Sequence, residues 1–270
     1  MSRFRDPIYL ISDQYKDTGN LNARIQLHER YSTNPYGWFR WVRDQIDLPP
    51  EAHILELGCG SGKLWSENVD RTLQGWKIAL SDFSYGMVHS CRSTLANKLD
   101  QFRFVASNAI AIPFPAATFD AVIANHMLFH IADRSLALVE IARVLKPNGT
   151  LYAATNGENH LLELDDMIEQ NYGSSDGILP GKPSRGFCLE NGAAQLSPWF
   201  RQVERRDYPD SLEVTDAEPL LAYIYSMVSP KFTQGGESSR SRLERVIKEL
   251  LHQQGCIQIQ KSSGMFIGKK

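Results

Sequence analysis

Residues 54–65 read ILELGCGSGKLW, an apolar run with one acidic residue that is followed by three glycines at alternate positions. The apolar run predicts a buried strand, and Gly58, Gly60 and Gly62 give the chain after it unusual backbone freedom. Glycines at a strand-to-helix turn let the backbone approach a ligand closely, and the amides of the helix N-terminus can face a carboxylate. The stretch therefore predicts a ligand-binding turn at the carboxyl end of the first strand.

The spacing of these glycines argues against two common nucleotide-binding loops. A Walker A loop requires Ser or Thr after its Gly-Lys pair, but Gly62 and Lys63 are followed by Leu64. The dinucleotide fingerprint requires GxGxxG, and Lys63 stands where its third glycine should be. We therefore expect the loop to hold a nucleoside without a phosphate clamp.

Predicted strands alternate with helical patterns through the middle of the chain. This alternation predicts a parallel sheet with helices on both faces, and right-handed crossovers make it a doubly wound, Rossmann-like α/β fold. Two further strands would complete a mostly parallel seven-stranded sheet, the last of them lying at its edge as a strand or hairpin. The predicted strands are 53–58, 77–82, 102–107, 120–126, 149–156, 202–208 and a C-terminal strand or hairpin within 257–269.

We expect one domain of residues 1–270, flanked by segments that cover its ligand site. Asn34 and Pro35 precede a helical pattern, and we expect Asn34 to cap that helix and Pro35 to occupy its first turn. The segment after the sixth predicted strand is long for a simple connection. The expected parts are an N-terminal helical lid at 1–50, a cofactor-binding core at 51–156 and a helical cap insertion at 209–250.

Polar side chains follow the next predicted strands at the same edge of the sheet. Asp82 ends the second strand about twenty residues after the glycines, where a carboxylate can accept both hydroxyls of a ribose. Asn108 and Ala109 follow the third strand, where amide and backbone N–H groups could read an adenine edge. Asn125 and His126 follow the fourth. Because open α/β sheets bind ligands outside the carboxyl ends of their strands, these groups predict a nucleoside site.

Four stretches resemble the class I S-adenosylmethionine-dependent methyltransferases, in the type 11 small-molecule branch that includes the ubiquinone/menaquinone C-methyltransferases. They cover roughly residues 53–156, in order and at the spacing of that family. The resemblance outside this range is much looser. The stretches are ELGCGSGKLW, LSDFSYGMV, FVASNAIAIPFPAATFDAVIANHMLFHIAD and EIARVLKPNGTLYAATNG.

The resemblance implies a cofactor, S-adenosylmethionine, and a role for each matching position. The three glycines of the loop would line the methionine moiety, with Glu56 anchoring the loop or, indirectly, the ammonium group of that moiety. Asp82 would hold the ribose, Phe83 and Met87 would pack on the adenine, and Asn108 with Ala109 would meet its edge. Asn125 would offer its carbonyl to the methionine ammonium. The family usually has Asp where this chain has Asn108, so we expect the substitution to weaken cofactor binding without abolishing it.

Methyl transfer needs an aligned acceptor and, for some acceptors, a base. His126 and His130 lie four residues apart after the fourth strand and are our candidate catalytic bases, although both could equally be structural. Their spacing would supply half of a metal site, but no partner motif such as HExxH accompanies it, so we expect no metal. Candidate acceptor-binding residues, each from a segment outside the family match or at its border, are Tyr31, Trp38, Asn156, His160 and Tyr225.

These observations predict an S-adenosylmethionine-dependent methyltransferase that acts on a small molecule by in-line displacement. A methyltransferase acting on RNA or protein is one alternative, and balanced charge argues against RNA. An NAD(P)-dependent oxidoreductase is another, against which the glycine spacing counts. A non-catalytic protein that binds S-adenosylmethionine is the third, because the transfer requires no obligatory side chain.

Composition sets the expectations for partners and compartment. The net charge is −2 over 270 residues, which gives no sign of electrostatic capture of nucleic acid or anionic lipid. The four cysteines show no zinc-type spacing, and no apolar run suggests a signal peptide or a membrane span. We expect a cytoplasmic monomer or homodimer that binds a small-molecule methyl acceptor.

Overall fold

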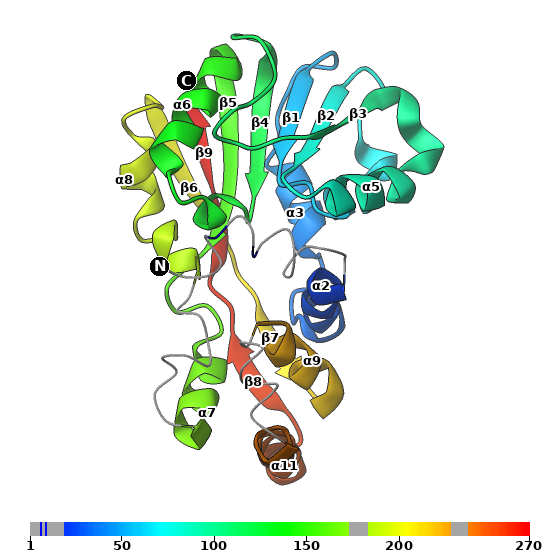
Figure 1. Ribbon diagram of the computed structural model, residues 1–270, viewed down its shortest axis with the longest axis vertical. Helices are drawn as coiled ribbons and strands as arrows, with labels where there is room; N and C mark the ends of the chain where they lie inside the picture. Colours follow the sequence, from blue (N-terminus) through cyan, green and yellow to red (C-terminus); the bar gives the residue numbers. More distant parts are fainter. Residues whose placement is uncertain (1–5, 7–8, 10–18, 173–182, 228–236) are drawn as a thin grey trace.

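A computed structural model describes residues 6, 9, 19–172, 183–227 and 237–270. Its main sheet has seven strands in the order β3-β2-β1-β4-β5-β9-β6 (Figure 1). This confirms the predicted seven-stranded, Rossmann-like α/β fold. The strands are β1 (His53–Leu57), β2 (Lys77–Asp82), β3 (Phe102–Ala106), β4 (Phe119–Asn125), β5 (Leu145–Asn156), β6 (Gln202–Tyr208) and β9 (Ser263–Lys269).

Strand β9 corrects the prediction that the C-terminal strand lies at the edge. The strands β3, β2, β1, β4 and β5 run parallel, whereas β9 is antiparallel to both β5 and β6 and lies between them. Six consecutive residues of β9 are buried. The strand pairs with β5 on one side and with β6 on the other, and both of its faces are covered. A strand buried on both faces reads as a continuous apolar run, which does not reveal its place in the sheet.

Helices pack on both faces of this sheet, as expected. Alternate residues of β1 point to opposite faces: Leu55 joins one apolar cluster with Leu138 and Leu196, and Ile54 joins a second with Val42 and Cys91. The two clusters are the core that fixes the sheet edge at which the site lies. The helices are α3 (Trp38–Asp44), α4 (Lys63–Ser66), α5 (Tyr85–Thr94), α6 (Arg134–Val144) and α8 (Gly192–Leu196), with short 3₁₀ turns η3 (Val69–Arg71), η4 (Ala96–Gln101), η5 (Leu128–His130) and η6 (Pro183–Gly186).

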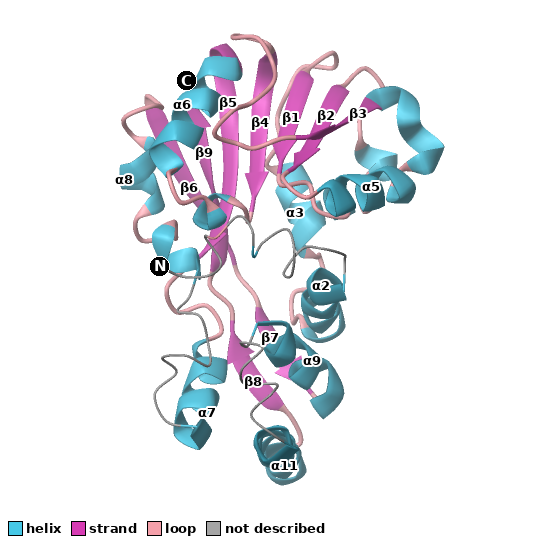
Figure 2. Ribbon diagram, in the orientation of Figure 1, coloured by secondary structure: helices cyan, strands magenta, loops and turns pink. Residues whose placement is uncertain are grey.

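A second lobe, the cap, lies beyond the carboxyl ends of β4 and β5 (Figure 2). It has a core of its own, in which Leu27, Leu164, Leu220 and Leu243 are buried together. The segment 209–250 that we expected to be a helical insertion also contains a strand, and the cap draws on three other stretches of chain. Its elements are α2 (Gly19–Tyr31), α7 (Leu162–Tyr172), α9 (Ala217–Met227), α11 (Glu237–Gln254) and the two-stranded antiparallel sheet of β7 (Ser211–Val214) and β8 (Ile257–Gln260).

The start of α3 corrects a local prediction. The helix begins at Trp38 after Gly37, whose φ of +85° is favourable only for glycine. Asn34 does not cap it, because its side-chain oxygen accepts the N–H of Tyr36 at 3.1 Å, and Pro35 therefore lies in a turn that precedes the helix. Most of the expected N-terminal lid before residue 19 lies outside the described residues. No helix in the described part of the chain is long and apolar enough to cross a bilayer.

Candidate functional site

The glycine loop leaves β1 in a conformation that only glycine adopts without strain. Gly58, Gly60 and Gly62 have φ angles of +71°, +53° and +81°. A Cβ on Gly58 would lie 2.7 Å from the Cβ of Met127, and one on Gly62 would lie 2.8 Å from the Cys91 sulfur. The loop thus needs glycine for its backbone angles and for its close contacts with neighbouring segments.

Asp82 ties this loop to β2. One of its carboxylate oxygens accepts the N–H of Gly60 at 3.0 Å, and the other accepts the N–H of Ser84 at 2.8 Å. Burial raises the pKa of Asp82, and these backbone N–H groups oppose that rise by stabilising the carboxylate. A carboxylate has about four lone-pair sites, and the backbone N–H groups of Gly60, Ser84 and Phe83 account for three of them, so the group can still accept from a ligand hydroxyl. Sequence reasoning had assigned Asp82 to the ligand alone and missed its role in holding the loop.

Glu56 is a buried carboxyl group beneath the same loop. It is 2% exposed, and its side chain accepts the indole N–H of Trp65 at 2.6 Å. Burial raises the pKa of Glu56 to about 8, the Trp65 hydrogen bond opposes this, and the nearby Asp82 charge adds to it. The hydrogen bond joins β1 to α4 across the loop, which fits the expected anchoring role.

Of the two side chains expected to pack on an adenine, Phe83 is accessible and Met87 is not. Phe83 is 39% exposed directly after β2, whereas Met87 is 1% exposed and lies within α5, facing the core. An exposed aromatic ring beside a nucleoside site is available for stacking. Met87 would contribute only if neighbouring side chains moved.

Asn108 follows β3 and Asn125 ends β4, and their side-chain amides differ in hydrogen bonding. The side-chain oxygen of Asn108 accepts the N–H of Ile110 at 3.2 Å, which stabilises a local turn beside the buried Ala109. The side-chain oxygen of Asn125 is buried and has no hydrogen-bond partner among the described residues. Buried polar atoms usually have partners, so this oxygen is a candidate acceptor for a ligand donor.

The two candidate bases differ in their surroundings. His126 has a φ of +54°, and its ring lies 4.9 Å from that of Trp38. Burial lowers the pKa of His126 to about 4, with smaller contributions from the charges of Lys261 and His130. His126 is therefore neutral at pH 7 and a weak proton acceptor. His130 lies in η5 with its ring 4.5 Å from that of Phe129.

The candidate acceptor residues divide into two groups. Asn156 and His160 lie near β9: Asn156 accepts the Ser263 hydroxyl at 2.9 Å, and Nδ1 of His160 accepts the Ser262 N–H at 3.2 Å. Trp38 contacts His126 and joins this edge of the sheet. Tyr31 and Tyr225, in contrast, are partly buried and pack against the apolar cluster of the cap.

A buried ion pair that sequence reasoning missed completes this edge. The ammonium group of Lys261 donates to the Asp210 carboxylate, and their side chains are 6% and 0% exposed. Asp210 also accepts the Ser32 hydroxyl and the N–H groups of Asn34 and Ser211. These residues come from separate parts of the chain with no motif, and burial of a lysine cannot be read from one sequence.

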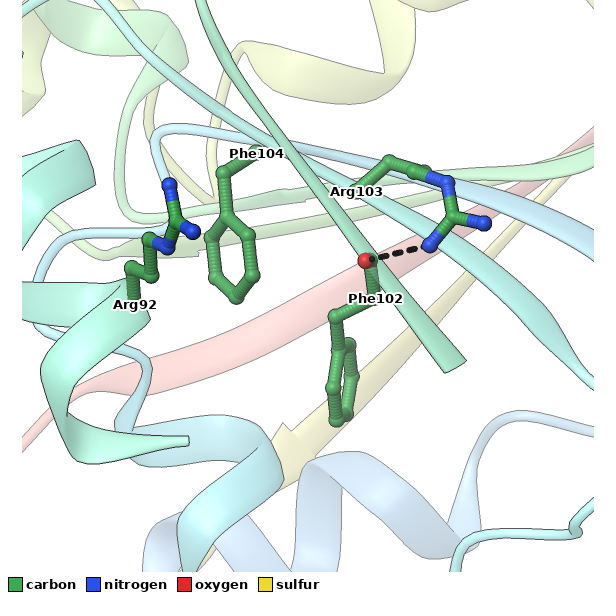
Figure 3. A pocket seen from close by; sticks show the side chains of 4 residues that line it. All are labelled: Arg92, Phe102, Arg103 and Phe104. Carbon is green, nitrogen blue, oxygen red and sulfur yellow. Dashed lines mark hydrogen bonds between the residues drawn. The ribbon is translucent and has the colours of Figure 1, made fainter. Parts of the chain in front are cut away.

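A surface hollow elsewhere does not belong to this site. It has a volume of about 310 Å³ and is lined by Arg92, Phe102, Arg103 and Phe104 (Figure 3). Phe102 begins β3, so the hollow lies toward the amino end of a strand at the edge of the sheet. Ligands of open α/β sheets bind at the opposite, carboxyl end.

A protein-family model described as a methyltransferase domain matches residues 55–153. The ubiquinone/menaquinone biosynthesis C-methyltransferase UbiE of Pectobacterium atrosepticum is 31% identical over 116 residues, which are 42% of this chain and 46% of that protein. The match thus spans about half the length of the curated relative. The range of the family model includes the glycine loop, Asp82 and Asn125.

Solved structures support the fold across more of the chain. The YcgJ protein of Bacillus subtilis superposes with a TM-score of 0.56 at 17% identity, covering 86% of this chain and 97% of that one. Phosphoethanolamine N-methyltransferase 2 of Haemonchus contortus, solved with S-adenosylmethionine, gives 0.59 at 18% identity, covering 99% and 60%. At these identities the likeness establishes the fold.

We expect Gly62→Ala to destabilise the protein more than Gly255→Ala. Both glycines have positive φ, +81° and +77°, but a Cβ at Gly255 meets nothing within 4 Å, whereas one at Gly62 meets the Cys91 sulfur. The strain from φ is common to both and amounts to about 1 kcal/mol, and the clash adds about 1–3 kcal/mol at Gly62 alone. Urea unfolding measures the free energy of unfolding of both variants. An equal loss in the two would contradict a steric clash at Gly62.

Replacing Glu56 with glutamine should make the protein's stability less sensitive to alkaline pH. With its pKa raised from 4.5 to about 8, the folded state holds one proton more than the unfolded state between those values. The free energy of unfolding of the wild type should therefore fall as pH rises through this window, by up to about 1.4 kcal/mol per pH unit. Urea unfolding from pH 5 to 8 should show the free energy of unfolding of the wild type falling relative to that of Glu56→Gln. The same pH dependence in both proteins would contradict a buried neutral carboxyl group at Glu56.

Proposed function

Because residues 55–153 belong to the class I, type 11 methyltransferase family, we propose that the whole chain transfers a methyl group from S-adenosylmethionine to a small molecule. The observation that carries this proposal is the Asp82 carboxylate, which holds the glycine loop and retains lone pairs for the ribose hydroxyls. The residues fit the cofactor, since the loop backbone lies beside the Asp82 carboxylate and the exposed ring of Phe83. When bound, S-adenosylmethionine supplies an electrophilic methyl group on a positively charged sulfur.

The chain's own groups bind and orient the cofactor in this proposal. The loop backbone lines the methionine moiety, and Phe83 stacks on the adenine from its exposed position. Asn108 and Ala109 meet the adenine edge, with Asn108 using the lone pair that Ile110 leaves free. The main-chain carbonyl of Asn125 accepts from the methionine ammonium.

His126 and His130 have different roles in this proposal. His126, neutral at pH 7, serves as a hydrogen-bonding wall of the acceptor site together with Trp38. His130 accepts a proton where the attacking atom of the acceptor carries one. Asn156 and His160 line the acceptor side at the end of β5, where hydrogen bonds from Ser263 and Ser262 fix their orientation.

A small molecule is the acceptor that the chain fits best. The relative that matches the core is named for methylation of carbon in ubiquinone and menaquinone synthesis, and the net charge of −2 gives no sign of electrostatic capture of RNA. All four cysteines are free thiols, which suits the reducing cytoplasm, where we place the protein as a monomer or homodimer.

Calorimetric titration with S-adenosylmethionine, S-adenosylhomocysteine and NADH tests the proposed cofactor. We expect both adenosyl ligands to bind and Asp82→Ala to weaken them by about 100-fold, because it removes the ribose contact and releases the loop. Asp120→Ala, at the opposite end of the sheet, is the matched carboxylate control, since Asp120 pairs with Lys146 away from the loop. Binding of NADH in place of the adenosyl ligands would overturn the proposal.

A further inference from the structure

Helix α2 contacts both the cap core and the glycine loop, and Figure 1 shows it between the main sheet and α9. Leu27 of α2 is buried in the apolar cluster of the cap, and the Arg24 guanidinium donates to the hydroxyl and the carbonyl of Ser226 in α9 at 3.0 and 2.9 Å. Near the start of the helix, Leu21 lies against the loop, because a Cβ added to Gly60 would be 3.3 Å from the Leu21 side chain. The helix therefore joins the cap to the backbone that lines the proposed cofactor site.

An exposed ion pair joins α2 to the segment that follows the loop. The ammonium group of Lys63, at the start of α4, lies 2.7 Å from the Glu29 carboxylate and 3.2 Å from that of Glu67. Glu29 belongs to α2, whereas Glu67 directly follows α4, so the first bridge crosses to the cap and the second does not. The Lys63 and Glu29 side chains are 31% and 48% exposed, and an ion pair in water forms and breaks with little change in free energy. This connection of α2 to the loop segment is therefore weak.

The chain directly after α2, in contrast, is held by a buried cluster. The Asp210 carboxylate accepts hydrogen bonds from the Ser32 hydroxyl and, at 3.0 Å, from the N–H of Asn34. It also pairs with the ammonium group of Lys261, and these two side chains are 0% and 6% exposed. Separating a buried ion pair is strongly unfavourable, because it leaves a charge without a partner. We call Ser32, Asp210 and Lys261 the junction cluster.

The junction cluster lies where the chain passes between the main sheet and the cap (Figure 2). Ser32 begins the link from α2 to α3, Asp210 lies in the link from β6 to β7, and Lys261 lies in the link from β8 to β9. The link from β5 to α7 runs beside it, since the Gly157 N–H donates to the carbonyl of Ser262 at 2.9 Å. Hinges in proteins are a few linker residues that absorb backbone rotation. Four such links meet at or beside the junction cluster, which makes it a natural pivot.

We propose that α2 is a strap that opens and closes over the glycine loop, with its latch in the Glu29–Lys63 ion pair and the Leu21 contact. The cap moves with the strap, because Arg24 and Leu27 fasten α2 to the cap, and the junction cluster is the pivot. The strap deepens the proposed function, on which it rests for the identity of the ligand, by controlling the rate of ligand exchange. Leu21 and Glu29 lie outside the residues matched by the family model, so the match does not supply this device.

The closed strap covers the backbone along which the cofactor is proposed to lie. Leu21 lies on Gly60, whose N–H donates to the Asp82 carboxylate at 3.0 Å. A ligand that follows this loop to Asp82 is therefore enclosed by α2, and it enters or leaves when the strap opens. Opening breaks the exposed latch and leaves the buried junction cluster intact, so the weaker contact sets how often the strap opens.

Stopped-flow tryptophan fluorescence of S-adenosylhomocysteine binding to Glu29→Gln tests the latch. We expect the association and dissociation rates both to rise by about two- to fivefold, with a smaller change in affinity, because the strap is open more often. Glu67→Gln is the matched control: it removes the other carboxylate beside Lys63 but leaves α2 latched, and it should exchange the ligand as the wild type does. Leu21→Ala should raise both rates as well.

Ionic strength provides a readout that a merely structural role of Glu29 would not move. Added salt screens an exposed ion pair, so the dissociation rate of the wild type should rise with salt concentration. The rate of Glu29→Gln should be nearly independent of salt, because its latch lacks the charge pair. Glu67→Gln should keep the wild-type dependence, since the Glu29–Lys63 pair remains.

Hydrogen exchange of the unliganded protein tests the strap without a ligand. We expect Glu29→Gln, but not Glu67→Gln, to speed exchange of the loop amides that α2 covers. The N–H groups of Asn34 and Ser211, which donate to Asp210, should stay equally protected in all three proteins, because the pivot does not open.

The outcomes separate the strap from the proposed cofactor. Unchanged rates in Glu29→Gln, or equal changes in Glu29→Gln and Glu67→Gln, would overturn the latch. Loss of protection at Asn34 and Ser211 in Glu29→Gln would overturn the pivot. A wild type that fails to bind S-adenosylhomocysteine, while Glu29→Gln still speeds exchange of the loop amides, would support the strap and count against the proposed function.

Discussion

The hydrogen bond from the Gly60 N–H to the Asp82 carboxylate is the contact on which the site depends. It joins the turn after β1 to the end of β2, and it holds a loop whose three glycines all have left-handed backbone angles. Such a loop has little internal reason to keep one shape, because glycine loses the most conformational freedom on folding. The buried contact of Trp65 with Glu56 supports the loop from below. Together they preorganise a backbone surface for the cofactor.

The features that depend on local sequence pattern could be predicted from the sequence. The alternation of apolar strands and amphipathic helices predicted the doubly wound sheet, and the glycine spacing with Asp82 predicted the edge at which we propose that the cofactor binds. The position of β9 between β5 and β6 was not predictable, because a strand buried on both faces looks the same wherever it lies. The additional role of Asp82 in holding the loop also needed coordinates, since it depends on where one backbone N–H points.

The buried Lys261–Asp210 pair was hidden for a different reason. Lys261, Asp210 and Ser32 are far apart in the chain and form no motif, so only the folded protein brings them together. A lysine is usually exposed, and nothing in a single sequence marks one that is buried. Of the candidate acceptor residues, Trp38 packs beside His126, whereas Tyr31 and Tyr225 are partly buried against the cap core, and their role in acceptor binding stays a prediction.

The central claim is that the carboxyl edge of the sheet holds S-adenosylmethionine between the glycine loop and Asp82. A crystal structure of the protein with S-adenosylhomocysteine tests it most directly. We predict that both ribose hydroxyls contact the Asp82 carboxylate, with the adenine against Phe83 and the homocysteine along the glycine loop. Density for the ligand in the hollow lined by Arg92, Phe102 and Phe104, or anywhere away from Asp82, would contradict the account.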